Sequence, residues 1–304
     1  MVADLSTGKV LIEEDADAVR YPASLTKLMT LYLLFDAIQH GWVTLDQKLP
    51  VSSWAAQQPA SRLGLRAGGH ISVEDCINSL ILRSANDVAM VVAEGLSGTE
   101  ARFADAMTHT AHRLGMNQTV FRNPSGLPDP AHVSSARDIL TLTETLITRF
   151  PQYYEYFGQR SCRIAGRTLV THNSFLARYD GADGLKTGYT QDAGYNLVAS
   201  VERGGHRLVG VVLGDSGLRA RDNTMARVMD DSFAQLGIPG LSRAHAASRT
   251  ARRGHRRAGI ERVARMRRHH AVRHHNGRHS VKSSRRATPS HRAKASSKRH
   301  RRRR

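Results

Sequence analysis

The chain has 304 residues, two cysteines and a formal net charge of +19 at pH 7. This length is enough for one large domain or two ordinary ones. The two cysteines, Cys76 and Cys162, exclude a disulfide framework, and their spacing does not suit a metal site. We expect no metal and no cofactor. No signal peptide is visible, and no apolar run is long enough to cross a bilayer.

The positive charge is gathered at the C-terminal end. Residues 243–304 contain 23 Lys and Arg against one acid, Glu261, and therefore carry +22. This leaves −3 on residues 1–242, as in an ordinary, slightly acidic globular domain. The basic segment has almost no large apolar residue, so it cannot bury enough surface to offset its ordering entropy. We therefore predict a folded body over 1–242 and a disordered Arg/His-rich tail over 243–304.

Apolar periodicity predicts strands at both ends of the body and helices between them. A hairpin is expected over 2–13. Helices are expected over 24–39, 75–82, 86–96, 100–114 and 136–147, with a breaker-rich loop at 123–130. Strands over 196–201 and 208–213 and a last helix over 221–236 follow. This order predicts the α+β class, in which an antiparallel sheet is built from both ends of the domain around an inserted helical subdomain.

The first expected helix begins with a serine and a lysine. Ser24 and Lys27 follow Pro22 and are three residues apart, so their side chains share one face near the positive end of the helix. A lysine buried there titrates low, and its neutral amine can take a proton from the hydroxyl. A lone Ser-x-x-Lys is more often a helix cap beside a surface lysine. Further motifs are therefore needed before this pair can be interpreted as catalytic.

Two further motifs offer polar groups at the ends of expected elements. Ser84 and Asn86 place a hydroxyl and an amide on a short loop between two apolar helices, where such a pair alone is a helix cap. Lys186, Thr187 and Gly188 precede the C-terminal strands. On an edge strand they offer a cation, a hydroxyl and a position without a side chain, which suits a ligand carboxylate close to the backbone. The alternative is a turn glycine beside a solvated lysine.

The three motifs occur in the order Ser-x-x-Lys, Ser-x-Asn and Lys-Thr-Gly, with gaps of 60 and 102 residues. This ordered set is the signature of class A β-lactamases and penicillin-binding proteins. Over roughly residues 2–237 the chain resembles the D-alanyl-D-alanine carboxypeptidases, low-molecular-mass penicillin-binding proteins that are serine peptidases of the penicillin-recognising fold. The segments that carry the likeness are 22–30, 84–87, 123–127, 184–190 and 193–197.

The resemblance implies a role for each residue of the first two motifs. Ser24 would be the nucleophile that attacks the carbonyl of the penultimate D-alanine, and Lys27 would be its general base. Ser84 would relay a proton towards the leaving amine. Asn86 would hold the substrate amide and orient Lys27.

The third motif would bind the end of the substrate. Lys186 and Thr187 would hold the terminal carboxylate, and Lys186 would help to keep Lys27 neutral through like-charge repulsion. Gly188 would leave room for the substrate backbone. The peptide would lie along this strand by β-augmentation.

The resemblance also implies an oxyanion hole and a second cation. The backbone N–H groups of Ser24 and Tyr189 would stabilise the oxyanion. Arg221 would assist carboxylate binding, with Arg219 close by in the sequence. No role is inferred for Ser125.

The implied activity is that of a serine-type D-Ala-D-Ala carboxypeptidase, which shortens peptidoglycan stem peptides through an acyl-enzyme and is acylated by β-lactams. A class A β-lactamase shares the motifs, but no Glu-x-x-Leu-Asn pattern lies between Ser84 and Lys186. Endopeptidase and transpeptidase activities share the acyl-enzyme step and stay open. The substrate implies a periplasmic or other extracytoplasmic location, so we expect the native start, with a signal peptide and one more strand, to lie upstream.

The basic tail predicts contact with polyanions, and a polyanion-binding protein without enzymatic activity is the alternative function. The nine histidines of 243–304 add charge below about pH 6.5. No aromatic residue lies in this segment, so base stacking with a specific nucleic acid is not expected. We expect anionic envelope polymers or lipid headgroups as partners, unless the tail is only a solubilising extension.

Overall fold

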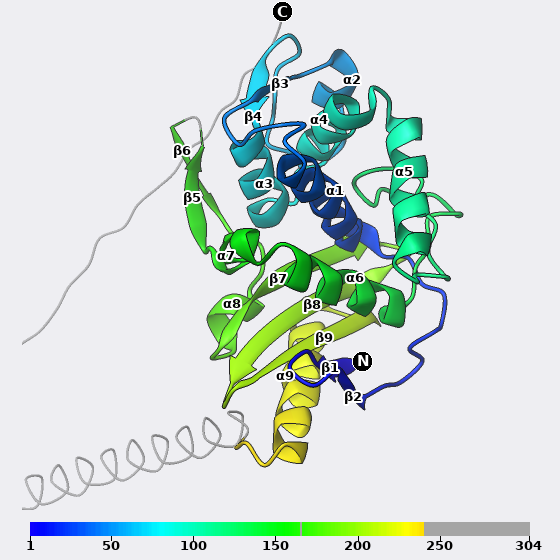
Figure 1. The fold of residues 1–304 in the computed structure, drawn as a ribbon, viewed down its shortest axis with the longest axis vertical. Helices are drawn as coiled ribbons and strands as arrows, with labels where there is room; N and C mark the ends of the chain where they lie inside the picture. The colour runs from blue at the N-terminus through cyan, green and yellow to red at the C-terminus, as the bar shows by residue number, and fades with distance from the viewer. Residues whose placement is uncertain (165, 240–304) are drawn as a thin grey trace, which may run out of the picture. The chain divides into compact units, whose positions relative to one another are not determined.

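The computed structural model describes residues 1–164 and 166–239. Within these residues the main sheet is antiparallel, with five strands in the order β2-β1-β9-β8-β7 (Figure 1). Its strands are β1 (Val2–Asp4), β2 (Lys9–Ile12), β7 (Ala182–Thr190), β8 (Gly194–Arg203) and β9 (His206–Asp215). β1 pairs with β9, and Ala3 lies opposite Val209. The sheet therefore unites the two ends of the described chain, which confirms the predicted α+β arrangement.

The two faces of the sheet bury different layers, because side chains alternate along a strand. Leu197 and Val201 of β8 belong to the cluster that packs with helix α9 (Leu218–Gln235). Val198, on the opposite face, belongs to the larger core shared with the helical block. Figure 1 shows α9 and the helical block on opposite sides of the sheet.

The helical block has long helices where the sequence predicts them, with ends within two residues of the expected ones after the first helix. They are α1 (Lys27–Gln39), α3 (Val73–Leu82), α4 (Asn86–Ser97), α5 (Glu100–Arg113) and α6 (Ala136–Arg149). Ser72, Thr99 and Ser135 cap α3, α5 and α6, since each side chain accepts an N–H from the residue three positions on. α1 is buried along most of its length, so it forms the centre of this block.

The helix expected over 24–39 begins differently from the prediction. Ala23–Thr26 forms a 3₁₀ turn, η1, and α1 starts only at Lys27. The backbone bends just before Ser24, because Ala23 has a left-handed φ of +48°. Ser24 therefore projects from a bend, and Lys27 is the first residue of the helix.

Several short elements were not predicted. The stretch 44–150, expected to be mostly helical, also contains the hairpin of β3 (Lys48–Pro50) and β4 (His70–Ser72) and the short helix α2 (Ser53–Ala56). Before β7 lie η2 (Pro151–Tyr153), α7 (Glu155–Gly158), the hairpin of β5 (Ser161–Ile164) and β6 (Arg167–Val170), and α8 (Phe175–Arg178). Elements of three or four residues are too short for a hydrophobic period to reveal them.

Cys76 is buried in α3, and neither it nor Cys162 is in a disulfide. Over the described ranges, no helix has both the length and the apolar character that a membrane span requires. The predicted tail, 243–304, lies outside the described residues.

Candidate active site

The turn η1, which carries Ser24, lies against the edge strand β7. Gly188 makes this approach possible, because a Cβ there would lie 3.0 Å from the carbonyl oxygen of Pro22 and 3.2 Å from the amide nitrogen of Ser24. Asn196 of β8 holds the same turn, since its side-chain amide donates to the carbonyl oxygens of Tyr21 and Pro22. The sheet thus fixes the position of the first motif relative to the third.

Lys27 is completely buried, and its ammonium has three acceptors. Nζ lies 3.1 Å from Ser24 Oγ, 2.8 Å from Asn86 Oδ1 and 2.6 Å from the carbonyl oxygen of Ser125. Asn86 is itself oriented, because its Nδ2 donates to the carbonyl oxygen of Pro59 at 3.0 Å. These contacts hold the amine within reach of the serine hydroxyl.

The environment of Lys27 lowers its pKa. Burial, helped by the nearby charge of Lys186, holds the pKa of Lys27 well below its ordinary value. Asp87 opposes this shift, but its carboxylate accepts N–H groups from residues 63–65 and so anchors a loop beside the site. The form of Lys27 that accepts a proton is therefore available at a lower pH than for a surface lysine.

Ser84 and Lys186 form a second contact at the site. Nζ of Lys186 donates to Ser84 Oγ and to the carbonyl oxygen of Thr187, each at 2.9 Å. Ser84 has a left-handed φ of +56°, a strained conformation that orients this residue between α3 and α4. Burial and the charge of Arg221 lower the pKa of Lys186 to about 7.

A cleft of about 660 Å³ connects these groups. Its walls include Ser24, Ser84, Asn86, Thr187, Gly188, Tyr189 and Arg221. Because Lys27 and Lys186 are hydrogen-bonded to Ser24 and Ser84, all nine residues singled out in the sequence lie together.

The structure also decides between the two arginines of α9. Arg221 is only 3% exposed and reaches the cleft, where Asp222 accepts its guanidinium N–H groups at 2.6 and 3.1 Å. Arg219 is exposed and does not line the cleft. Arg219 and Arg221 are two positions apart on α9, so their side chains point in directions that differ by roughly 200°. Only one of them can therefore face the cleft.

Two contributions to the site were missed. Asn123 Oδ1 accepts the N–H groups of Ser125, Gly126 and Leu127, and this folds the loop so that the Ser125 carbonyl reaches Lys27. The Asn-Pro-x-Gly-Leu pattern was the available signal. His172 also lines the cleft, and no pattern around it predicts this position.

A sheet between helical layers, with Ser-x-x-Lys, Ser-x-Asn and Lys-Thr-Gly around one cleft, defines the class of penicillin-recognising proteins. The sequence profile of the D-alanyl-D-alanine carboxypeptidase family, peptidase S11, matches residues 1–217. The chain belongs to this family.

Individual relatives agree with this assignment. DacF of Bacillus subtilis, a D-alanyl-D-alanine carboxypeptidase, is 34% identical over 241 residues, which are 77% of this chain and 61% of DacF. Penicillin binding protein 5 from Haemophilus influenzae is similar with a TM-score of 0.74 and 30% identity, over 77% of this chain and 69% of that one. Penicillin-Binding Protein D2 from Listeria monocytogenes, in a cefotaxime-bound form, has a TM-score of 0.70 and 32% identity. The match covers 76% of this chain and 95% of that one. The chain spans about three fifths of the length of the curated relatives such as DacF.

Proposed function

We propose that this chain is a serine-type D-Ala-D-Ala carboxypeptidase, which removes the terminal D-alanine from peptidoglycan stem peptides. The observation that carries the proposal is the 3.1 Å contact between the buried Nζ of Lys27 and Ser24 Oγ. The contact lies beside a cleft that also holds the cation of Arg221. Membership of the carboxypeptidase family supports the same activity.

Acylation begins when the neutral amine of Lys27 accepts the proton of Ser24 and Oγ attacks the carbonyl carbon of the penultimate D-alanine. The N–H groups of Ser24 and Tyr189 stabilise the oxyanion. Asn86 holds the substrate amide. When the C–N bond breaks, the peptide stays on Ser24 as an ester. The departing D-alanine takes the proton held by Lys27, relayed through Ser84, which leaves Lys27 neutral again.

Deacylation uses the same groups in reverse. Lys27 takes a proton from water, which attacks the ester, and Ser24 regains its hydrogen as the shortened peptide leaves. The terminal carboxylate of the substrate binds to Lys186, Thr187 and Arg221 through charge-assisted hydrogen bonds. The peptide backbone adds to the free edge of β7, which is the last strand of the sheet.

β-Lactams mimic the D-Ala-D-Ala end, so we expect them to acylate Ser24 and to be released slowly. The similar protein from Listeria monocytogenes is described in a cefotaxime-bound form. The segment between Ser84 and Lys186 has no Glu-x-x-Leu-Asn pattern, so nothing marks a deacylating glutamate of the lactamase kind. Because stem peptides lie outside the cytoplasmic membrane, we place the reaction in the periplasm or another extracytoplasmic space.

Intact mass after incubation with penicillin tests the proposal. Wild type gains one adduct, and Ser24→Ala gains none; an adduct on Ser24→Ala would refute the assignment of the nucleophile. Release of D-alanine from a D-Ala-D-Ala peptide then identifies the carboxypeptidase. Rapid loss of the penicillin adduct identifies a lactamase instead. Transfer of the acyl group to an added amine identifies a transpeptidase, and cleavage of cross-linked peptides identifies an endopeptidase.

We also propose that a catalytic part, 1–242, is tethered to anionic envelope polymers or lipid headgroups by the tail, 243–304. The charge of +22 on this segment supports the tether, and the lack of aromatic residues favours salt-sensitive, unselective contacts. The full chain and a 1–242 truncation should differ in binding to anionic vesicles and to cell-wall sacculi at low salt. Equal binding by the two proteins would contradict the tether.

A further inference from the structure

The loop between α5 and α6 packs against the helix that carries the proposed base. Lys27 Nζ donates to the carbonyl oxygen of Ser125 at 2.6 Å. Thr30 Oγ1, further along α1, donates to the carbonyl oxygen of Pro124 at 2.6 Å. Both donor side chains are completely buried. The position of this loop therefore decides where the Ser125 carbonyl meets the amine of Lys27.

His132 joins the two ends of this loop. Val120 and Val133 pair there through two backbone hydrogen bonds of 3.0 Å. Beside this pair, Nδ1 of His132 accepts the backbone N–H of Arg122 at 3.1 Å. Because that N–H donates, Nδ1 carries no proton. Burial lowers the pKa of His132 to about 4, so the ring is neutral near pH 7 and its N–H hydrogen is on Nε2.

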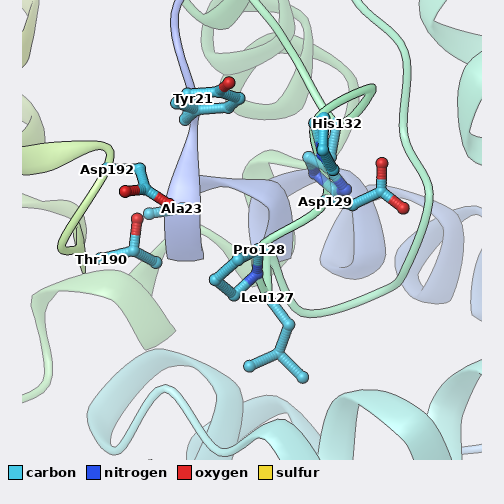
Figure 2. A pocket seen from close by; sticks show the side chains of 10 residues that line it. Tyr21, Ala23, Leu127, Pro128, Asp129, His132, Thr190 and Asp192 are labelled. Atoms are coloured by element: carbon cyan, nitrogen blue, oxygen red, sulfur yellow. The ribbon is translucent and has the colours of Figure 1, made fainter.

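The Nε2–H of His132 is directed at the turn that carries the nucleophile. Nε2 lies 2.7 Å from Thr26 Oγ1, which accepts this hydrogen. Thr26 belongs to η1 and lies between Ser24 and Lys27 in the chain. His132 and Thr26 are both buried, so bulk water cannot replace the bond if it is lost. Figure 2 shows His132 and Ala23, from the same turn as Thr26, among the residues around one small cavity.

The turn η1 is held on both sides of Ser24. Before the serine, the side-chain amide of Asn196 donates to two carbonyl oxygens of the chain that enters the turn. After the serine, the bond from His132 holds Thr26. The loop can approach this closely because Gly126 has no Cβ, which would lie 2.9 Å from Thr26 Oγ1. A short turn that is fixed on both sides keeps the side chain between them in one place, as a nucleophile requires.

We propose that His132 is a positioning residue for acylation, which holds Ser24 and Lys27 at their reacting distance through its bond to Thr26. The inference rests on the proposed function and adds a residue to its machinery. The groups proposed to bind the substrate carboxylate come from β7 and α9, and neither element takes part in this bond. Loss of the bond should therefore slow the reaction of bound substrate and leave binding almost unchanged.

Two substitutions of His132 separate its two hydrogen bonds. The side-chain oxygen of asparagine falls near the position of Nδ1, so His132→Asn can still accept the N–H of Arg122 but cannot reach Thr26. The side-chain nitrogen of glutamine falls near the position of Nε2, so His132→Gln keeps the donor to Thr26. At saturating penicillin, we expect acylation of His132→Asn to be about tenfold slower than that of wild type, and acylation of His132→Gln to stay within about threefold. The non-covalent binding constant for penicillin should change by less than about twofold in both variants.

A double-mutant cycle tests whether His132 acts through Thr26. Thr26→Val removes the hydroxyl and keeps the branched shape, so it should slow acylation about as much as His132→Asn does. The double variant should be no slower than either single variant, because both changes remove the same bond. Thr143→Val is the matched control, since Thr143 of α6 is also fully buried and its hydroxyl donates to the carbonyl oxygen of Ile139 at 2.7 Å. This control should lose stability and keep the acylation rate of wild type.

Equal acylation rates of His132→Asn and His132→Gln would overturn the proposal, and so would a wild-type rate for Thr26→Val. If His132→Asn does not fold, the comparison of Thr26→Val with Thr143→Val decides. A loss confined to penicillin binding would also contradict a positioning role. Failure of the proposed function would look different, because wild type would then form no adduct on Ser24. Normal adduct formation by wild type and by all the variants would therefore refute the role of His132 alone.

Discussion

Ser84 and Lys186, 102 residues apart in the chain, are joined beside the cleft by a hydrogen bond of 2.9 Å. The serine comes from the loop between α3 and α4, and the lysine comes from the edge strand β7. This bond therefore ties the helical block to the sheet at the reaction site. Since Lys186 is the donor, the hydroxyl hydrogen of Ser84 is left for a partner in the cleft.

The pH profile of acylation should have two limbs. Activity rises with pH as Lys27 loses its proton, at a pH well below the ordinary value for lysine. It falls again as Lys186, whose pKa is about 7 in the free protein, loses the charge that binds a carboxylate. Measuring kcat/KM for a D-Ala-D-Ala peptide from pH 5 to 10 checks this. A substrate amidated at its terminal carboxyl should lack the alkaline limb; an identical limb for both substrates would contradict the role of Lys186.

The same lysine should make stability depend on pH. Lys186 has a pKa of about 7 when folded, and about 10.4 when unfolded, so the unfolded state binds more protons between these values. The free energy of unfolding should therefore rise from pH 7 towards pH 10, by at most about 1.4 kcal/mol per pH unit, and this gain is lost as pH falls through 7. Denaturant unfolding of wild type and Lys186→Met at several pH values tests this. The variant should have the flatter curve, and parallel curves would rule the effect out.

His132 should destabilise the fold in acid. Its folded pKa of about 4 lies below the unfolded value of about 6.5, so the neutral ring contributes stability that is lost as pH falls through this window. Protonation would also remove the acceptor for the N–H of Arg122. His132→Gln should unfold with a weaker pH dependence between 6.5 and 4. His112→Gln, on an exposed face of α5, should behave as wild type; equal slopes for both variants would contradict this account.

Two glycines with similar φ allow the cost of backbone strain to be distinguished from the cost of a steric clash. Gly115 and Gly126 have φ of +87° and +80°, but a Cβ at Gly115 meets nothing within 4 Å. Gly115→Ala should cost about 1 kcal/mol of stability and leave penicillin acylation intact. Gly126→Ala should also press on the carbonyl of Ala23, beside the nucleophile, and slow acylation by at least about tenfold. Penicillin acylation rates and melting curves of both variants test this prediction. Similar acylation rates would show that the close packing at Gly126 does not affect acylation.

Much of the site could be read from the sequence because its residues act through side chains. The residues proposed as nucleophile, base, relay and cation are Ser24, Lys27, Ser84 and Lys186, and they occur in the order of a known signature. Ser125 could not be found this way. It contributes a backbone carbonyl, which every residue possesses, and its direction depends on the fold of the loop.

The sequence by itself determined the long helices, the strands at both ends and the family, because hydrophobic periodicity and motif order are local properties of the chain. Tertiary structure alone decided the left-handed bend at Ala23 and which of Arg221 and Arg219 reaches the cleft. It also decided how Lys27 and Lys186 titrate. A pKa depends on burial and on charges that lie close in space, and the groups that shift these two lysines come from segments far apart in the chain.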